Sequence, residues 1–186
     1  MTCIAGLAEG GTVWLAGDSA GIAGWDLTVR ADPKVFVNGP YVMGFTSSFR
    51  LGQLLRYSFS PPVPETDDLH EFMCTAWIDA LRSCLKDGGY ASKDKEQEEG
   101  GVFLAGVAGR LFLICADYQV GEAADGYQAC GCGDQAALGA LHATAGMRLP
   151  PAERLRKAMG AAERLSAGVR GPFTIARTPA KGSTDG

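Results

Sequence analysis

Apolar positions in the first quarter of the chain recur with the two-residue period of β-strands. Alternating runs predict extended segments at 3–8 and 12–18, and the Gly10-Gly11 pair between them is typical of a tight hairpin turn. Three further short extended segments are expected, at 27–30, 35–37 and 41–45. The chain therefore opens with several short strands, of which the first two form an antiparallel hairpin.

The period then changes to that of amphipathic helices. Residues 48–57 carry their large apolar side chains on one helical face, and a longer helix is expected from about Asp67 to Lys86. The highly charged stretch at 91–101 predicts an exposed loop. The succession then repeats, with strands at 102–107, 111–116 and 127–130, helices at 134–145 and 151–165, and a last strand at 173–176. Helices grouped between antiparallel hairpins predict an α+β sandwich with sheets inside and helices outside.

The length of 186 residues is that of one domain with a two-sided core. We expect this domain to span 1–178. The remaining residues, 179–186, are small and polar and predict a flexible tail.

Charge and hydropathy exclude several kinds of partner. The net charge is −4 and the basic residues are scattered, which argues against a nucleic-acid partner and against a basic membrane-binding patch. No apolar run approaches the roughly 20 residues that span a bilayer, and the first residues do not resemble a signal peptide. We therefore expect no membrane association and a cytoplasmic location.

Six cysteines without an export signal are most simply reduced thiols. Cys130 and Cys132 are too few ligands for a zinc site, and His70 and His142 fall in expected helices without companion ligands. The sequence therefore predicts neither a metal nor an organic cofactor.

Thr2 follows the initiator Met1 directly and starts the first strand. If Met1 is removed, Thr2 carries a hydroxyl and a free α-amine, and an α-amine with a pKa near 7.7–8.0 can accept a proton at neutral pH. A threonine activated by its own terminal amine is an established nucleophile that needs no histidine.

Such a nucleophile also needs a nearby cation, a carboxylate to hold that cation, and a donor to the oxyanion. Asp18 lies sixteen residues after Thr2 and Lys34 sixteen residues further, each at the end of an expected strand. Gly44 is the candidate oxyanion donor, because glycine permits close approach of its backbone N–H.

Each of these residues also has an ordinary structural interpretation. Thr2 suits a strand start, Asp18 a turn, Lys34 an exposed strand edge, and Gly44 a bulge. Cys3 is a rival nucleophile, but strand alternation places it on the face opposite Thr2, where a buried thiol is expected.

In combination, these landmarks resemble the proteasome β-subunit family and its bacterial two-component protease relative, the N-terminal nucleophile hydrolases. The resemblance runs from Thr2 through LAGDS, DPKVF and GFTSS, and resumes at GVFLAGVAGRLFLI and ACGCGDQAALGAL. It implies a four-layer α-β-β-α sandwich, a homo-oligomeric ring, peptide or protein substrates, and an ATP-dependent unfoldase as a possible partner.

The resemblance also implies roles for individual residues. Thr2 would be the nucleophile and its amine the general base, while Lys34 lowers the amine pKa, Asp18 pairs with Lys34, and Gly44 supplies the oxyanion hole. The family lines its first specificity pocket at the positions of Gly21, Asp32 and Val42.

Two departures from the family pattern concern the surroundings of the amine. Cys132 stands where the family has a serine between two glycines, and a thiol donates a weaker hydrogen bond than a hydroxyl. The family's aspartate after the last helix is missing, which leaves Glu163 or Ser166 as the nearest polar substitutes.

The sequence thus predicts a threonine-type hydrolase that cleaves peptide or amide bonds by acyl transfer. A non-catalytic structural or assembly subunit that retains Met1 is the alternative. A small-molecule amidohydrolase of the same superfamily is a third reading.

Overall fold

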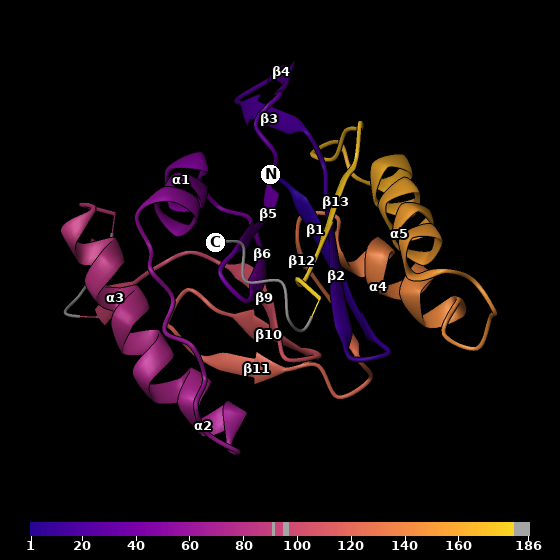
Figure 1. Ribbon diagram of the computed structural model, residues 1–186. Helices are drawn as coiled ribbons and strands as arrows, with labels where there is room; N and C mark the ends of the chain where they lie inside the picture. Colours follow the sequence, from indigo (N-terminus) through magenta and orange to yellow (C-terminus); the bar gives the residue numbers. More distant parts are fainter. Residues whose placement is uncertain (91, 95–96, 181–186) are drawn as a thin grey trace.

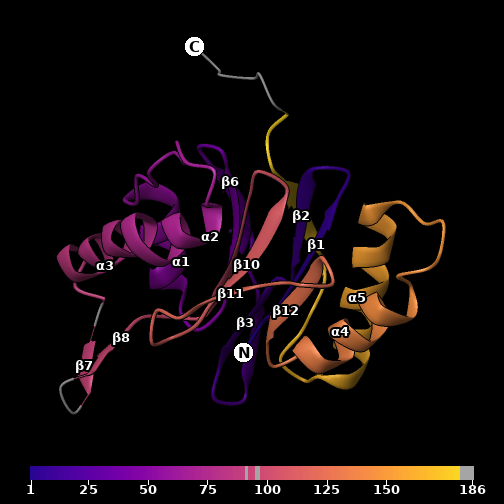
Figure 2. The ribbon, with the colours of Figure 1, turned by 90° about the horizontal axis from the view of Figure 1, so that it is seen from below.

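The computed structural model describes residues 1–90, 92–94 and 97–180, and its elements form four layers. Two sheets lie face to face in the middle, and helices cover the outer face of each (Figures 1 and 2). The predicted α+β sandwich is therefore confirmed. From residue 181 onward, the predicted tail lies outside the described residues.

The first sheet has the strand order β12-β1-β2-β13 and is antiparallel throughout. Its strands are β1 (Cys3–Glu9), β2 (Thr12–Gly17), β12 (Tyr127–Gly131) and β13 (Thr174–Arg177). The predicted hairpin joins β1 to β2, so that Ile4 pairs with Gly17, while on the other edge of β1 Cys3 pairs with Gly131. This register brings the start of β1 to the ends of both neighbouring strands.

The second sheet has the order β11-β10-β9-β6-β5. Its strands are β5 (Val35–Asn38), β6 (Tyr41–Phe45), β9 (Phe103–Val107), β10 (Arg110–Ile114) and β11 (Val120–Glu122). Strand β6, next to the edge strand β5, shows the two-residue period clearly. Tyr41, Met43 and Phe45 join the cluster beneath the helices, whereas Val42 joins the cluster between the two sheets.

Helices cover the sandwich on both sides (Figure 2). One outer layer holds α4 (Asp134–Ala143) and α5 (Pro151–Leu165), which pack on the first sheet. The other holds α1 (Phe49–Tyr57), α2 (Leu69–Phe72), the π-helical turn η1 (Met73–Trp77) and α3 (Ile78–Asp87). The long helix expected from Asp67 to Lys86 is thus present, with a π-helical turn inside it.

Two hairpins lie outside the sandwich. The hairpin of β3 (Ala20–Ala23) and β4 (Asp26–Val29) follows β2 and projects beyond the layers near the N-terminus (Figure 1). Strands β7 (Ser92–Asp94) and β8 (Gln97–Glu99) form a second hairpin where a loop was predicted. The prediction is wrong for these two strands, because their backbone groups pair with each other. Residues 91, 95 and 96 of the predicted loop lie outside the described residues.

Within the described residues, no helix is both long and apolar enough to span a bilayer.

Candidate active site

Thr2 lies at the start of β1, between the ends of β2 and β12, and is buried. Its carbonyl accepts a hydrogen bond of 2.8 Å from the Cys132 N–H, and its hydroxyl donates one of 2.5 Å to the carbonyl of Met1. The Thr2 carbonyl is therefore fixed by the residue after β12, and the Thr2 hydroxyl is directed back at the peptide bond that precedes it.

Lys34 comes from the segment just before β5, and its side chain is only 1% exposed. Its Nζ donates to Thr2 Oγ1 at 3.0 Å, to Asp18 Oδ1 at 2.9 Å and to the carbonyl of Ala20 at 2.6 Å. Three acceptors use all three ammonium hydrogens, which fixes the position of the charge. Burial lowers the pKa of Lys34 below its ordinary value, and the carboxylate of Asp18 opposes that shift.

Asp18 follows β2 and is as fully buried as Lys34. Besides Lys34, its Oδ1 accepts the N–H of Cys3 at 3.0 Å. Its Oδ2 accepts the N–H of Ala20 at 2.9 Å and that of Arg170 at 3.4 Å. A buried carboxylate with this many donors is held in one orientation, so Asp18 anchors the lysine that contacts Thr2.

A second group of polar residues meets Thr2 from the side of β12 and α5. Cys132 Sγ lies 3.4 Å from the Thr2 carbonyl oxygen, and the hydroxyl of Ser166 donates to Cys132 Sγ at 3.3 Å. Glu163, the other polar substitute considered, accepts the N–H of Gly171 at 2.9 Å. Ser166 is therefore connected to Thr2 through Cys132, whereas the Glu163 carboxylate is engaged by the loop after α5.

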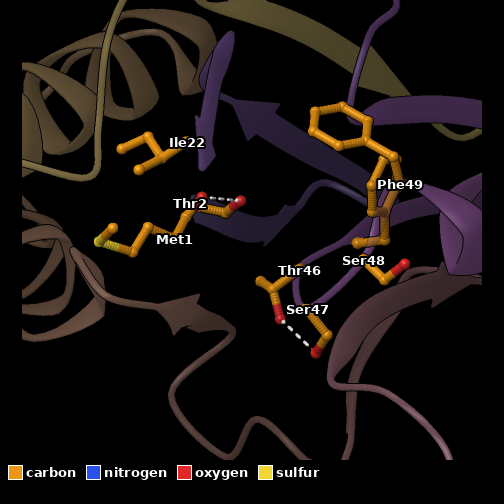
Figure 3. Close-up of a pocket in the computed structure, with 8 residues that line it drawn as sticks. Met1, Thr2, Ile22, Thr46, Ser47, Ser48 and Phe49 are labelled. Carbon is orange, nitrogen blue, oxygen red and sulfur yellow. Dashed lines mark hydrogen bonds between the residues drawn. The ribbon is translucent and has the colours of Figure 1, made fainter. Parts of the chain in front are cut away.

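A cavity of about 160 Å³ opens beside Thr2 (Figure 3). Figure 3 shows Thr2 between Ile22 of β3 on one side and the segment after β6, including Phe49, on the other. The lining residues are Met1, Thr2, Ile22, Phe45, Thr46, Ser47, Ser48 and Phe49. The nucleophile candidate therefore faces a pocket with apolar and hydroxyl-bearing walls.

The structure does not bring Gly44 to this pocket. Gly44 lies within β6 and pairs with both Val35 and Leu104, and a Cβ on it would lie 2.7 Å from Ile4 Cγ2. Its backbone is thus buried between two strands and against the other sheet. Gly44 is glycine because the two sheets approach closely there, so the prediction of an oxyanion donor at this position is wrong.

Ser47, three residues after Gly44, lines the pocket beside Thr2 and is the candidate oxyanion donor in place of Gly44. It has a φ of 65°, a left-handed conformation that is uncommon for a residue other than glycine. Among the described residues, its backbone N–H makes no hydrogen bond, while its hydroxyl accepts the N–H of Val102 at 3.2 Å. Three successive polar residues, Thr46 to Ser48, right after a strand were the only sequence signal for it.

Three residues were predicted to line the first specificity pocket. The prediction is wrong for Val42, because its side chain is fully buried between the two sheets. Gly21 lies on β3 next to Ile22, with the Arg30 side chain packed against it. Asp32 accepts two hydrogen bonds of 2.7 Å from Arg30, whose guanidinium lies 3.7 Å from the ring centroid of Phe49. Gly21 and Asp32 therefore both contact Arg30, and Arg30 stacks on Phe49 of the pocket wall.

Cys3 lies, as predicted, in the core on the opposite face of β1 from the pocket. Burial, followed by the charge of Asp18, raises the pKa of its thiol to about 12. A thiol with that pKa is protonated at neutral pH, so it is a poor nucleophile. No group of three metal-ligating side chains occurs among the described residues.

Comparison with known structures shows which proteins share this fold. No protein-family model matches the chain, and no curated protein matches it. The BPH of Thiobacillus denitrificans superposes with a TM-score of 0.79 at 20% identity, over 95% of this chain and 97% of that one. The fold is proteasome-like. BPH was also solved in complex with epoxomicin, with the same TM-score and identity.

Two further structures share the proteasome-like fold. Eukaryotic HslV from Trypanosoma brucei has a TM-score of 0.67 at 20% identity, covering 95% of this chain and 98% of that one. Anbu, the ancestral β-subunit from Yersinia bercovieri, has a TM-score of 0.64 at 15% identity, covering 96% and 82%. Similarity at this level of identity establishes the N-terminal nucleophile hydrolase fold, and the activity depends on the site residues.

Proposed function

We propose that the protein is a threonine-type N-terminal nucleophile hydrolase that cleaves peptide or amide bonds by acyl transfer through Thr2. The observation that carries this proposal is the contact of 3.0 Å between the buried Lys34 Nζ and Thr2 Oγ1. A buried lysine is costly, and a structural role would be served equally well by an apolar residue. A hydroxyl nucleophile needs an activating group beside it, and Asp18 holds the charge of Lys34 in contact with this hydroxyl.

The reaction begins once Met1 has been removed. Met1 itself is 61% exposed, whereas Thr2 is buried. The freed α-amine lies on the same residue as the hydroxyl, and the nearby charge of Lys34 disfavours protonation of that amine. The amine accepts the hydroxyl proton while Thr2 Oγ1 attacks the substrate carbonyl.

The intermediate then collapses to an ester. The amine gives its proton to the leaving nitrogen as the carbon–nitrogen bond breaks, and the acyl group stays on Thr2 Oγ1. Water attacks the ester with the amine again as base, which releases the acid and restores the hydroxyl. The N–H of Ser47, in place of that of Gly44, stabilises the oxyanion in both steps.

Cys132 and Ser166 are proposed to flank the amine. Gly168 packs between Cys132 and Met1, since a Cβ on it would lie 2.5 Å from Cys132 Sγ and 2.6 Å from Met1 Cβ. Cys132 Sγ also lies 3.4 Å from the carbonyl oxygen of Thr2, the residue that would carry the amine. The Ser166–Cys132 hydrogen bond provides a path for a proton to or from the amine.

The wider setting that we propose is a cytoplasmic homo-oligomer, a ring in which the substrates are peptides or unfolded proteins delivered by an ATP-dependent unfoldase. The exposed apolar side chains of the β3–β4 hairpin, Trp25, Leu27 and Val29, support self-association. Light scattering of the purified protein that gives the 19.5 kDa of a monomer would contradict it.

A non-catalytic subunit that retains Met1 is the second candidate, and it differs from the first in whether the nitrogen of Thr2 is free. Met1 lines the pocket, and the Thr2 hydroxyl is bonded to the Met1 carbonyl. While Met1 remains, the nitrogen of Thr2 is an amide and cannot act as a base.

Intact mass and covalent labelling distinguish the two candidates. We expect the purified protein to lack Met1 and to gain the mass of one molecule of epoxomicin, mapped to Thr2. Thr2→Ala should take up no label and cleave no peptide, while Thr12→Ala, at the far end of the same hairpin, should behave as the wild type. Retention of Met1 together with absence of labelling would favour the non-catalytic subunit.

A further inference from the structure

The wall of the pocket beside Phe49 contains an ion pair that was not expected from the sequence. Arg30 Nε and Nη2 each donate at 2.7 Å to one carboxylate oxygen of Asp32. The same guanidinium stacks on Phe49, with its central carbon 3.7 Å from the ring centroid. Phe49 therefore contacts both this ion pair and the cavity.

The four charged side chains around the pocket form two ion pairs. Asp32 is occupied by Arg30, and Asp18 by Lys34, whose Nζ lies 5.6 Å from the Phe49 ring centroid. The hydrogen bonds from Arg30 lower the pKa of Asp32, so this carboxylate stays ionised and paired at neutral pH. A charged substrate side chain in the pocket would find no unpaired partner among these four groups.

The shape and lining of the pocket suit an apolar side chain. Ile22, Phe45 and Phe49 supply carbon surface. Thr46, Ser47 and Ser48 add hydroxyls on the same side of Thr2 as Phe49, opposite Ile22 (Figure 3). An apolar cavity of about 150 Å³ is large enough to hold a benzene molecule. The cavity beside Thr2 measures about 160 Å³ with Met1 in its lining, so removal of Met1 leaves room for a branched aliphatic or phenyl group.

Resting on the function proposed above, we infer that Arg30 sets the specificity of this pocket. By occupying Asp32 and stacking on Phe49, it makes the protein cleave after leucine- or phenylalanine-like residues rather than after basic ones. Asp32, predicted from the sequence to favour basic side chains, becomes available to a substrate only when Arg30 is removed.

The test compares cleavage of four tripeptide amides that differ only in a terminal Leu, Phe, Arg or Glu. We expect the wild type to prefer Leu and Phe over Arg and Glu by about tenfold or more in kcat/KM. Arg30→Met keeps the apolar stem on Phe49 but frees Asp32, and should raise the Arg-to-Leu ratio by about fivefold. Arg30→Met combined with Asp32→Asn is the matched control, in which the ratio should return toward the wild-type value.

A wild-type preference for Arg or Glu, or an Arg-to-Leu ratio that Arg30→Met leaves unchanged, would overturn the inference. A binding measurement separates this failure from failure of the proposed function. Calorimetric titration of Thr2→Ala with the same four peptides should give the same order of affinities. If Thr2→Ala shows that order while the wild type cleaves nothing, the pocket is as inferred and the proposed hydrolase activity is wrong.

Discussion

The ammonium nitrogen of Lys34 lies 3.0 Å from the hydroxyl oxygen of Thr2, although 32 residues separate the two in the chain. Lys34 approaches from the second sheet and Thr2 from the first, so the contact bridges the two central layers. Asp18 lies on the far side of the ammonium group, 2.9 Å from Nζ. The lysine therefore links the hydroxyl to a buried carboxylate in a fixed row of three groups.

Removal of Lys34 is expected to abolish activity and also to destabilise the fold. Lys34→Met leaves the buried carboxylate of Asp18 without its counter-charge, a loss that costs about 3–5 kcal/mol of unfolding free energy. Adding Asp18→Asn should recover much of this free energy, because both charges are then gone, but none of the activity. Urea denaturation and peptide cleavage measure the two effects separately. Full activity of the double variant would show that the pair is structural only.

Ser47 is expected to act through its backbone and not through its hydroxyl. Ser47→Gly keeps the N–H and suits the φ of 65°, so kcat should stay within about twofold of the wild type while the left-handed conformation becomes less costly. Ser47→Val places a β-branched side chain at that φ, which displaces the N–H and should lower kcat by about 10²-fold or more. A large loss of kcat in Ser47→Gly would instead assign the role to the hydroxyl.

The row of Thr2, Asp18 and Lys34 could be predicted from the sequence, in part from the first hairpin and in part from the resemblance to the proteasome β-subunit family. The hairpin signal at Gly10-Gly11 fixes the register of β1 and β2, which places Asp18 beside the start of β1. Lys34 immediately precedes a strand at the matching level of the second sheet. The position of Asp18 follows from the hairpin register, whereas the contact between Lys34 and Thr2 crosses the two sheets and was implied by the family resemblance.

The walls of the pocket could not be predicted in the same way. Ser47 and Phe49 are placed by a left-handed turn between β6 and α1, and Ile22 by a hairpin that stands outside the sandwich. Val42 and Gly44 were misassigned even though a period-two signal was available. They alternate with the large side chains of β6 and therefore face the other sheet, not the pocket.

Gly131 is expected to be essential for the placement of Thr2. It has a φ of 102°, and a Cβ on it would lie 2.2 Å from the carbonyl oxygen of Thr2. Gly131→Ala should therefore displace the start of β1, lower the melting temperature and remove activity. Gly139→Ala is the matched control, since it lies in α4 with open space around it and should stabilise the protein by about 0.5–1 kcal/mol. Equal effects of the two substitutions would contradict this account.

Thiol reactivity is expected to separate the cysteines into two classes. Cys74 and Cys132 are exposed, whereas Cys3 and Cys130 are buried with raised pKa values. Iodoacetamide at pH 8 should alkylate the exposed pair in the native protein and leave the buried pair unmodified until urea is added. Peptide mapping measures each site. Alkylation of Cys3 in the native protein at the rate of Cys74 would show that the start of β1 opens readily.

The same burial predicts a loss of stability at alkaline pH. The thiol of Cys3 has a pKa of about 12 when folded and an ordinary value of 9.0. Above about pH 9 the unfolded chain therefore binds fewer protons than the folded one at this residue, so the free energy of unfolding falls as the pH rises. One pH unit above 9, this thiol should account for a loss on the order of 1 kcal/mol. Cys3→Ala removes the titrating group, so its urea midpoints should fall less between pH 8 and pH 10 than those of the wild type. Parallel curves for the two proteins would mean that the folded pKa of Cys3 is ordinary and that its thiol reaches solvent.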